Sequence, residues 1–229
     1  MSSIAIIPAR GGSKRIPRKN IRVFHGKPMI VWSIQAALES NVFDKVIVST
    51  DDDEVASIAQ AAGALVPFQR PRELSGDHAA TMPVVTHAIG WWQENCGPLD
   101  FGCCVYATAP FLRPASLVES IRMLRTTDAE FVLSVGQFRY PVQRSLRLDG
   151  LGKLNFAEPE NAFKRSQDLE TRYHDAGQFF AGRVEALMTH ESVLFGQCLP
   201  LIVPEDEVID IDNDQDWCLA EKLYSVRSR

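Results

Sequence analysis

The residues best suited to chemistry form a short segment near the start of the chain, residues 8–20, which combines adjacent glycines, a serine and several cations. Gly11 and Gly12 let the backbone approach a ligand closely, and backbone N–H groups with the Ser13 hydroxyl can surround phosphate oxygens. The cations that could neutralise a triphosphate are Arg10, Lys14 and Lys19. The segment therefore predicts a phosphate-binding loop, and the alternative is a solvated basic turn.

A pair of aspartates, Asp210 and Asp212, lies near the end of the chain in a short apolar stretch, 208–212, that is expected to be a strand. Residues two apart in a strand point to the same face, so the two carboxylates repel each other unless a cation lies between them. Mg²⁺ is typically bound by one or two carboxylates together with substrate phosphates. The pair predicts a magnesium site, and the alternative is a solvated, acidic helix N-terminus.

The elements that must position these residues alternate between apolar strands and amphipathic helices. The expected strands cover 4–8, 45–49, 101–106, 131–135, 178–182 and 199–203, and the expected helices 28–40, 51–63, 81–95, a stretch from Pro114, and a last one capped by Asn213 or Asp214. Asp51 and Glu54 have the spacing of a capping box. This alternation predicts a Rossmann-like α/β fold with a mostly parallel sheet flanked by helices. The loop after the first strand then lies at the carboxyl ends of the strands, where such folds bind ligands.

The alternation is interrupted between residues 136 and 175, a polar stretch that contains several arginines. A structureless stretch of this length is unusual inside a compact domain. We expect a single domain, 1–229, with an inserted hairpin or arm over 136–175 that packs on a partner subunit. The alternative is a flexible surface loop.

Composition excludes several classes of protein. The net charge of −5 argues against a nucleic-acid-binding protein, which normally has a basic face. No apolar run is long enough to span a membrane, and no basic region precedes an apolar stretch at the N-terminus, so we expect a cytoplasmic protein without a signal peptide. The five cysteines form no Cys-x-x-Cys pair, which predicts reduced thiols rather than a zinc site or disulfides.

Four segments together resemble the CMP-sugar synthetases, the cytidylyltransferases that act on sialic acid and related sugars. Residues 7–21 resemble the family's N-terminal signature, although Arg15 replaces the common glycine. The other segments are 49–52, 70–77 with Thr81, and 107–113. The resemblance covers essentially the whole chain and implies a fold of the nucleotide-diphospho-sugar transferase type, with Mg²⁺ as cofactor and a homodimer formed through the arm.

The resemblance also implies roles for individual residues. The nucleotide-binding candidates are Ala9, Arg10, Gly11, Gly12, Ser13, Lys14, Lys19, Asn20, Arg70 and Thr81. The alternative role of Arg70 is a surface ion pair, and that of Thr81 is helix capping. The catalytic candidates are Arg10, Lys14, Asp210 and Asp212, the last two as metal ligands.

The sugar is suggested by the segment 173–180, which resembles the branch of the family that acts on pseudaminic acid. Tyr106 favours the same branch, since the sialic acid enzymes usually have Gln there. The sugar-binding candidates are Tyr106, Thr108, Gln167, Asp175 and Gln178. The expected partners are thus CTP and an acidic nine-carbon sugar, with no nucleic acid and no membrane. Sialic acid, legionaminic acid and KDO stay open as alternative sugars.

The expected reaction is an in-line transfer in which the anomeric hydroxyl of the sugar attacks the α-phosphorus of CTP and pyrophosphate leaves. Positioning and charge neutralisation should dominate such a reaction, and Arg10 and Lys14 would stabilise the leaving pyrophosphate. The general base stays open between a metal-bound hydroxide and an aspartate. A rival of another class is a non-catalytic nucleotide-binding module. An NAD(P) enzyme is excluded because the first loop lacks the required glycine spacing.

Overall fold

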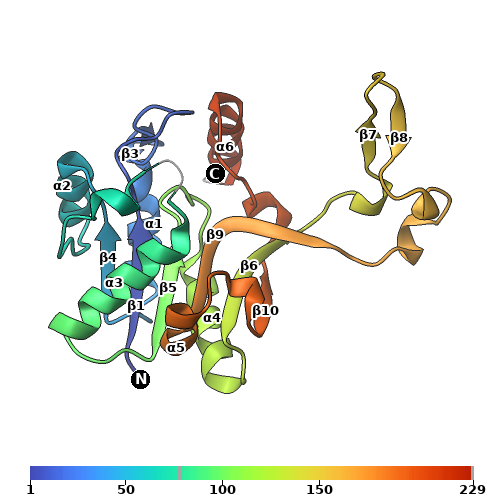
Figure 1. Ribbon diagram of the computed structural model, residues 1–229. Helices are drawn as coiled ribbons and strands as arrows, with labels where there is room; N and C mark the ends of the chain where they lie inside the picture. The colour runs from blue at the N-terminus through green and yellow to red at the C-terminus, as the bar shows by residue number, and fades with distance from the viewer. Residues whose placement is uncertain (77–78, 228–229) are drawn as a thin grey trace.

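The computed structural model of the protein describes residues 1–76 and 79–227. Its centre is a six-stranded sheet with the strand order β10-β6-β9-β5-β1-β4 (Figure 1). These strands are β1 (Ser3–Pro8), β4 (Lys45–Ser49), β5 (Phe101–Val105), β6 (Phe131–Gln137), β9 (Tyr173–Arg183) and β10 (Cys198–Ile202). All pairings in this sheet are parallel except those of β9, which is antiparallel to both neighbours. The predicted mostly parallel sheet is confirmed.

Helices cover both faces of the sheet (Figure 1). They are α1 (Met29–Glu39), α2 (Asp53–Ala61), α3 (Thr81–Asn95), α4 (Pro114–Thr126), α5 (Val184–Thr189) and α6 (Asp214–Arg227). One apolar core lies between the sheet and α1, α2 and α4, and a second lies between the sheet and α3 and α5. Alternate residues of β1 point to opposite faces, so Ile7 belongs to the first core and Ile6 to the second. Burial on both faces explains why the strands are apolar throughout.

The reversed direction of β9 brings additional residues to the functional edge of the sheet. The parallel strands β1, β4 and β5 end at one edge, and β9 begins there because it runs the opposite way. β9 begins at Tyr173, five residues before the predicted start, since its first residues pair with the end of β6 beyond a break in register: Val135 with Asp175 and Gln137 with Tyr173. Asp175 therefore lies at the same edge as the loop that follows β1.

The cap of α2 differs from the prediction. Asp52, not Asp51, is the N-cap, and its carboxylate accepts a hydrogen bond from the Val55 N–H at 2.9 Å. Asp51 instead accepts a hydrogen bond from the Gly11 N–H at 3.0 Å. The predicted capping box of Asp51 and Glu54 is wrong because Asp51 is engaged by the loop after β1, one residue before the helix cap.

The predicted strand over 208–212 is also wrong. β10 is followed by Pro204, which has no N–H to donate to a sheet, and by the 3₁₀ helix η6 (Glu205–Glu207). Residues 208–212 are irregular and lead into α6. The alternation that suggested a strand reflects burial, since Ile211 is fully buried with Phe24 and Trp217 in a third apolar cluster beneath α6. This cluster also holds the small hairpin of β2 (Val23–Phe24) and β3 (Lys27–Pro28).

The stretch between β6 and β9 forms an arm that projects away from the sheet (Figure 1). It contains a hairpin of β7 (Leu146–Leu148) and β8 (Leu154–Phe156) and three 3₁₀ helices, η2 (Val142–Arg144), η3 (Pro159–Asn161) and η4 (Ser166–Asp168). The arm exposes large apolar side chains, of which Phe163 is 99% exposed. The prediction that this arm packs on a partner subunit stays a prediction.

Candidate active site

The loop after β1 is fixed by contacts to the start of α2. Gly11 lies so close to Asp52 that a Cβ at position 11 would be 2.4 Å from Asp52 Oδ2, so only glycine fits without displacing that carboxylate. Arg18 donates to the same carboxylate and to Glu54. The Asn20 side-chain amide donates to the Arg10 carbonyl at 2.9 Å, which joins the two ends of the loop. The loop is therefore held by side chains before any ligand arrives.

This loop forms one side of a pocket of about 540 Å³ at the carboxyl edge of the sheet. Nine of the predicted site residues line the pocket: Arg10, Ser13, Lys14, Lys19, Asn20, Arg70, Thr81, Tyr106 and Thr108. They come from the loop after β1, the segment after α2, the start of α3 and the loop after β5. The volume suits a nucleotide-sized ligand, and the cations suit a polyanion. Asp77, in one of the family-like segments, lies outside the described residues.

Arg70 lies beneath the pocket rather than on the surface, with only 6% of the residue exposed. Its guanidinium donates to the Ser49 hydroxyl at 3.1 Å and to the Ser49 carbonyl. Burial lowers the pKa of Arg70, which nearby Arg10 lowers further and Asp51 partly restores. An arginine pKa is so high that the group stays charged, so Arg70 contributes a fixed positive charge to the pocket. Its alternative assignment as a surface ion pair is wrong.

Thr81 is the first residue of α3, and it does not cap the helix, because the N-cap is Ala80. Its hydroxyl is hydrogen-bonded to Tyr106. Burial is the main cause that raises the pKa of the Tyr106 phenol, and neighbouring acidic groups raise it further. Tyr106 therefore stays protonated across the physiological pH range and can donate a hydrogen bond.

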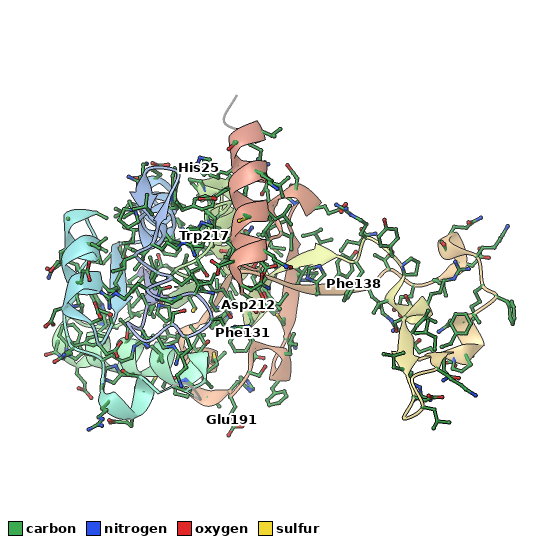
Figure 2. All side chains as sticks on the ribbon, turned by 90° about the horizontal axis from the view of Figure 1, so that it is seen from above. His25, Phe131, Phe138, Glu191, Asp212 and Trp217 are labelled. Carbon is green, nitrogen blue, oxygen red and sulfur yellow. The ribbon has the colours of Figure 1, made fainter. Side chains whose placement is uncertain are left out.

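The acidic segment before α6 meets the loop after β1, although the two are separated by almost the whole sequence. Arg15 Nη2 lies 2.7 Å from Asp212 Oδ1, and Lys19 Nζ lies 3.8 Å from the same atom. Lys19 Nζ also donates to the Ile211 carbonyl at 2.5 Å. Burial lowers the pKa of Lys19, whereas the charges of Asp212 and Asp210 act in the opposite direction. Figure 2 shows Asp212 at the foot of α6, where that helix meets the body of the protein.

The two aspartates have the electrostatics of a weak cation site. Burial raises the pKa of Asp210, and the negative charge of Asp212 raises it further. A cation between the two carboxylates would relieve this repulsion. Among residues 1–76 and 79–227, no group of three or more His, Cys, Asp or Glu side chains could hold a metal ion. One or two carboxylates are the protein ligands that Mg²⁺ typically has where water and substrate phosphates supply the others, so the chemistry of the pair is compatible with that cation.

A second pocket, of about 420 Å³, adjoins the first at Tyr106, which lines both. It is lined by Tyr106, Leu133, Val135, Tyr173, His174, Asp175, Phe180, Ser192, Val193 and Leu194. Most of these side chains are apolar or aromatic, and Asp175 adds a carboxylate that accepts a hydrogen bond from the Gly177 N–H at 2.7 Å. Two pockets that share Tyr106 as a lining residue can hold two reactants side by side.

The remaining predicted residues, the proposed metal ligands Asp210 and Asp212 among them, do not line either pocket. Ala9 is buried, and Gly11 and Gly12 belong to the loop backbone. Gln167 lies on η4 in the arm, so it reaches neither hollow within this chain. Gln178 is 3% exposed, and its amide donates to the Glu207 carbonyl at 2.7 Å.

Sequence reasoning missed two features of this site. Arg15, noticed only as a departure from a family pattern, is paired with Asp212. Glu207 is buried, and it was not among the residues singled out from the sequence. No local pattern could have found either contact, because each joins distant parts of the sequence.

Comparison with known proteins places the chain in a family. A family described as Cytidylyltransferase matches residues 4–191. The chain belongs to the cytidylyltransferase family. This cytidylyltransferase is 40% identical over 226 residues to a pseudaminic acid cytidylyltransferase of Campylobacter jejuni, covering 99% of this chain and 97% of that relative. It is 31% identical over 233 residues to a CMP-N,N'-diacetyllegionaminic acid synthase of Legionella pneumophila, with the same coverage of 99% and 97%.

Solved structures agree with the fold of the cytidylyltransferase. A CMP:2-keto-3-deoxy-manno-octonic acid synthetase complexed with CTP matches with a TM-score of 0.70 and 18% identity, covering 100% of this chain and 99% of that one. A 4-diphosphocytidyl-2C-methyl-D-erythritol synthase from Anaerococcus prevotii matches with a TM-score of 0.64 and 13% identity, covering 98% of each chain. At these identities the likeness concerns the fold.

Proposed function

We propose that this cytidylyltransferase transfers CMP from CTP to the anomeric hydroxyl of pseudaminic acid and releases pyrophosphate. The observation that carries the proposal is the 40% identity to a pseudaminic acid cytidylyltransferase over nearly the full length of both chains. The proposal is further supported by the two pockets that meet at Tyr106, one lined by cations and the other mainly by apolar side chains.

In the proposed reaction, CTP occupies the larger pocket with its phosphates against the loop after β1. Arg10, Lys14 and the Ser13 hydroxyl face this pocket, where they can bind the triphosphate and stabilise the negative charge that grows on the leaving pyrophosphate. Arg70 adds a fixed positive charge from below. Because the backbone of the loop that carries Arg10, Ser13 and Lys14 is already fixed by Asp51 and Asn20, little reorganisation of the loop is needed in the transition state.

The residues proposed to hold Mg²⁺ are Asp210 and Asp212. When bound, the cation would supply charge neutralisation at the α-phosphate and lower the pKa of the attacking hydroxyl. Asp212 pairs with Arg15 and lies near Lys19, so the metal site and the phosphate loop share charged contacts. This arrangement supports a cation that binds together with the nucleotide rather than before it.

The sugar is proposed to occupy the smaller pocket, next to Tyr106 and Asp175. A nine-carbon acid with deoxy and acetamido groups presents more apolar surface than one rich in hydroxyls, which suits a lining that includes Leu133, Val135 and Phe180. Thr108 lines the larger pocket, on the same loop as Tyr106, and can reach the attacking end of the sugar.

The proposed assembly is a cytoplasmic homodimer formed through the arm. The exposed apolar side chains of the arm support a partner on that surface, since a monomer seldom exposes so much apolar area in one place. The five cysteines are free thiols, in keeping with a reducing compartment. Among the helices of residues 1–76 and 79–227, none is long and apolar enough to cross a membrane. In a dimer, Gln167 could approach a site of the partner, which would account for its absence from both pockets here.

The test is pyrophosphate release from CTP with Mg²⁺, comparing pseudaminic, legionaminic, N-acetylneuraminic acid and KDO. We expect the highest kcat/KM with pseudaminic acid. A higher kcat/KM with another of these acids would support the proposed CMP transfer but would show that pseudaminic acid is not the preferred sugar. If no acid gives pyrophosphate, the proposal is wrong and the chain is a nucleotide-binding module.

The metal assignment has its own variant. Asp210→Ala should lower kcat about a hundredfold even at saturating Mg²⁺, as expected when one electrostatic contact to the transition state is lost. Asp214→Ala is the matched control, because it removes an exposed aspartate of the same acidic segment, whose carboxylate pairs with Arg22 at 2.6 Å. Equal activity of the two variants would show that Asp210 does not bind the metal.

A further inference from the structure

Glu207 is a buried carboxylate that no step proposed above uses. It is 1% exposed, and Arg113 and Arg227 both form ion pairs with its Oε1, the latter at 2.9 Å. Its other oxygen, Oε2, is buried and accepts no hydrogen bond from the part of the chain that the structure describes. Burial removes the Glu207 carboxylate from water, and this desolvation costs free energy that an exposed carboxylate does not lose. The two arginines compensate for that cost only while the carboxylate stays charged.

The partners of Glu207 come from three parts of the fold that surround the candidate site. Arg113 directly precedes α4 and follows the loop that carries Tyr106 and Thr108. Arg227 lies in the last turn of α6. The third partner, Gln178 of β9, donates its side-chain amide to the backbone carbonyl of Glu207 at 2.7 Å. Glu207 thus connects the β5–α4 loop, β9 and the C-terminal helix at one point.

The segment that follows Glu207 has no sheet pairing to hold it. Residues 208–212, which carry both aspartates, are irregular. At the far end, the N–H groups of Asp212 and Asn213 donate to the Asp216 carboxylate, each at 3.0 Å. At the near end the chain is fixed by Glu207, three residues before Asp210. Between these ends, Ile211 is fully buried and its carbonyl accepts a hydrogen bond from Lys19 Nζ at 2.5 Å. The position of the aspartates therefore depends on Asp216 and Ile211 on one side and on the buried Glu207 on the other.

We propose that Glu207 is a positioning residue that holds Asp210 and Asp212 in place for a divalent cation. The inference rests on the proposed metal site of the cytidylyltransferase. Glu207 touches neither pocket, so it acts through the backbone that connects it to Asp210. Its negative charge is required because two guanidinium groups converge on one oxygen, and a neutral side chain of the same shape would leave their charges uncompensated.

The test compares Glu207→Gln with Glu205→Gln. The first keeps the shape and one acceptor of the side chain and removes the charge. The second removes an equal charge two residues earlier in the same turn, where Glu205 is exposed and paired with Arg139. The readouts are backbone amide hydrogen exchange of residues 205–212 in the metal-free protein, the Mg²⁺ concentration for half-maximal activity, and kcat and KM for CTP.

For Glu207→Gln we expect faster amide exchange in residues 208–212, and a rise in half-saturating Mg²⁺ with a fall in kcat of about tenfold each, since misplacing a reacting group by even 1 Å is costly. KM for CTP at saturating Mg²⁺ should stay near that of the wild type, because the phosphate loop is not changed. Glu205→Gln should match the wild type in all readouts. Wild-type exchange and Mg²⁺ dependence in Glu207→Gln would overturn the proposal.

A second variant covers the case in which Glu207→Gln does not fold. Arg227→Gln keeps the pair of Arg113 and Glu207 and removes the ion pairs that Arg227 of α6 forms with Glu207 and, at 3.7 Å, with Asp206. It should shift exchange and Mg²⁺ dependence in the same direction by a smaller factor, and unchanged values would contradict the proposal. If the proposed enzyme function is wrong, the wild-type protein releases no pyrophosphate. Amide exchange of residues 205–212 can still be compared between the wild type and the variants, so the two failures are distinguished.

Discussion

The guanidinium of Arg15 lies 2.7 Å from the carboxylate of Asp212, so a residue of the phosphate loop neutralises one of the two proposed metal ligands. Arg15 also lines the larger pocket, where a triphosphate would attract it. If the proposed metal site is correct, the arginine and the cation would compete for the same carboxylate before nucleotide binds. Nucleotide binding, which offers Arg15 another anion, would release Asp212 for the metal.

We therefore predict that Arg15→Ala lowers the Mg²⁺ concentration required for half-maximal activity. The Arg15 side chain is 68% exposed, so the ion pair is worth about 0.5 kcal/mol and the expected shift is about twofold. The measurement is a Mg²⁺ titration of pyrophosphate release at a CTP concentration well below its KM, where most of the protein is nucleotide-free and Arg15 still pairs with Asp212. Arg22→Ala, which removes a similar pair with Asp214 away from the pocket, should leave the titration unchanged. A higher Mg²⁺ requirement in Arg15→Ala would show that the arginine assists metal binding.

The two glycines of the phosphate loop should differ in their tolerance of a methyl group. A Cβ at Gly11 would lie 2.4 Å from Asp52 Oδ2, whereas a Cβ at Gly12 meets nothing within 4 Å. Gly11→Ala should destabilise the protein by about 1–3 kcal/mol, as overpacking does, and weaken CTP binding because the loop must shift. Gly12→Ala should unfold at the wild-type urea midpoint. Equal midpoints for the two variants in urea unfolding would count against the described loop conformation.

Asp52 should give the stability a dependence on acid pH. Its pKa is lowered, mainly by the hydrogen bond from Arg18, with the Val55 N–H adding to the effect and burial opposing it. Because the pKa of Asp52 is lower in the folded than in the unfolded protein, the ionised carboxylate stabilises the fold. This stabilisation is complete at pH values above the ordinary aspartate pKa and is lost as the pH falls through the lowered pKa of the folded protein. Asp52→Ala should cost about 1 kcal/mol at pH 7 through loss of the helix cap, and Asp52→Asn less, since asparagine also caps.

The check is urea unfolding of the wild type and both variants from neutral to acid pH. The difference between the wild type and Asp52→Asn should shrink as the pH decreases, because protonated aspartate and asparagine are then equally uncharged. A difference that stays constant over this range would mean that Asp52 has no depressed pKa.

Much of the fold follows from sequence pattern because each strand is a local apolar run that any parallel sheet must bury. β1 and β4 lie where the pattern predicts them. The stretch 208–212 was predicted as a strand on the same grounds, yet it pairs with no strand in the part of the chain that the structure describes. An alternating sequence pattern shows only that alternate side chains are buried. Packing of these side chains against the apolar cluster that includes residues of α6 produces the same pattern without a sheet.

The site was less accessible to sequence reasoning than the fold. The loop after β1 could be recognised because its glycines and cations are contiguous. Arg15 meets Asp212, and Arg113 meets Glu207, only after the sheet has brought separate loops to one edge. The placement of Asp175 depends on the reversed direction of β9, and an apolar run carries no information about strand direction.

Tyr106 should influence which sugar is accepted. It lines both pockets, and Thr81 is hydrogen-bonded to its hydroxyl. Tyr106→Gln introduces the residue usual in the sialic acid enzymes, and we expect kcat/KM for pseudaminic acid to fall about tenfold or more while that for N-acetylneuraminic acid falls less. Tyr106→Phe, which keeps the ring, should retain the wild-type preference. Unchanged preference in Tyr106→Gln would place the determinants of the sugar elsewhere.

The arm should control the oligomeric state. Phe163 and Leu148 are 99% and 69% exposed, and in a dimer they would be covered. The double variant Phe163→Ser/Leu148→Ser should convert a dimer into a monomer in light scattering at micromolar concentration. Phe195→Ser provides the control, because Phe195 is 72% exposed but lies on η5 (Val193–Phe195), outside the arm. A wild-type protein that is already monomeric would reject the dimer.

The arm begins and ends at one point of the sheet. β6 ends at Gln137, β9 begins at Tyr173, and these two residues are register partners. A tight turn between them would close the two strands into an ordinary β-hairpin without disturbing the core. A change in the length of the arm would therefore leave the pairing of β6 and β9, and with it the strands that carry the candidate site, unchanged.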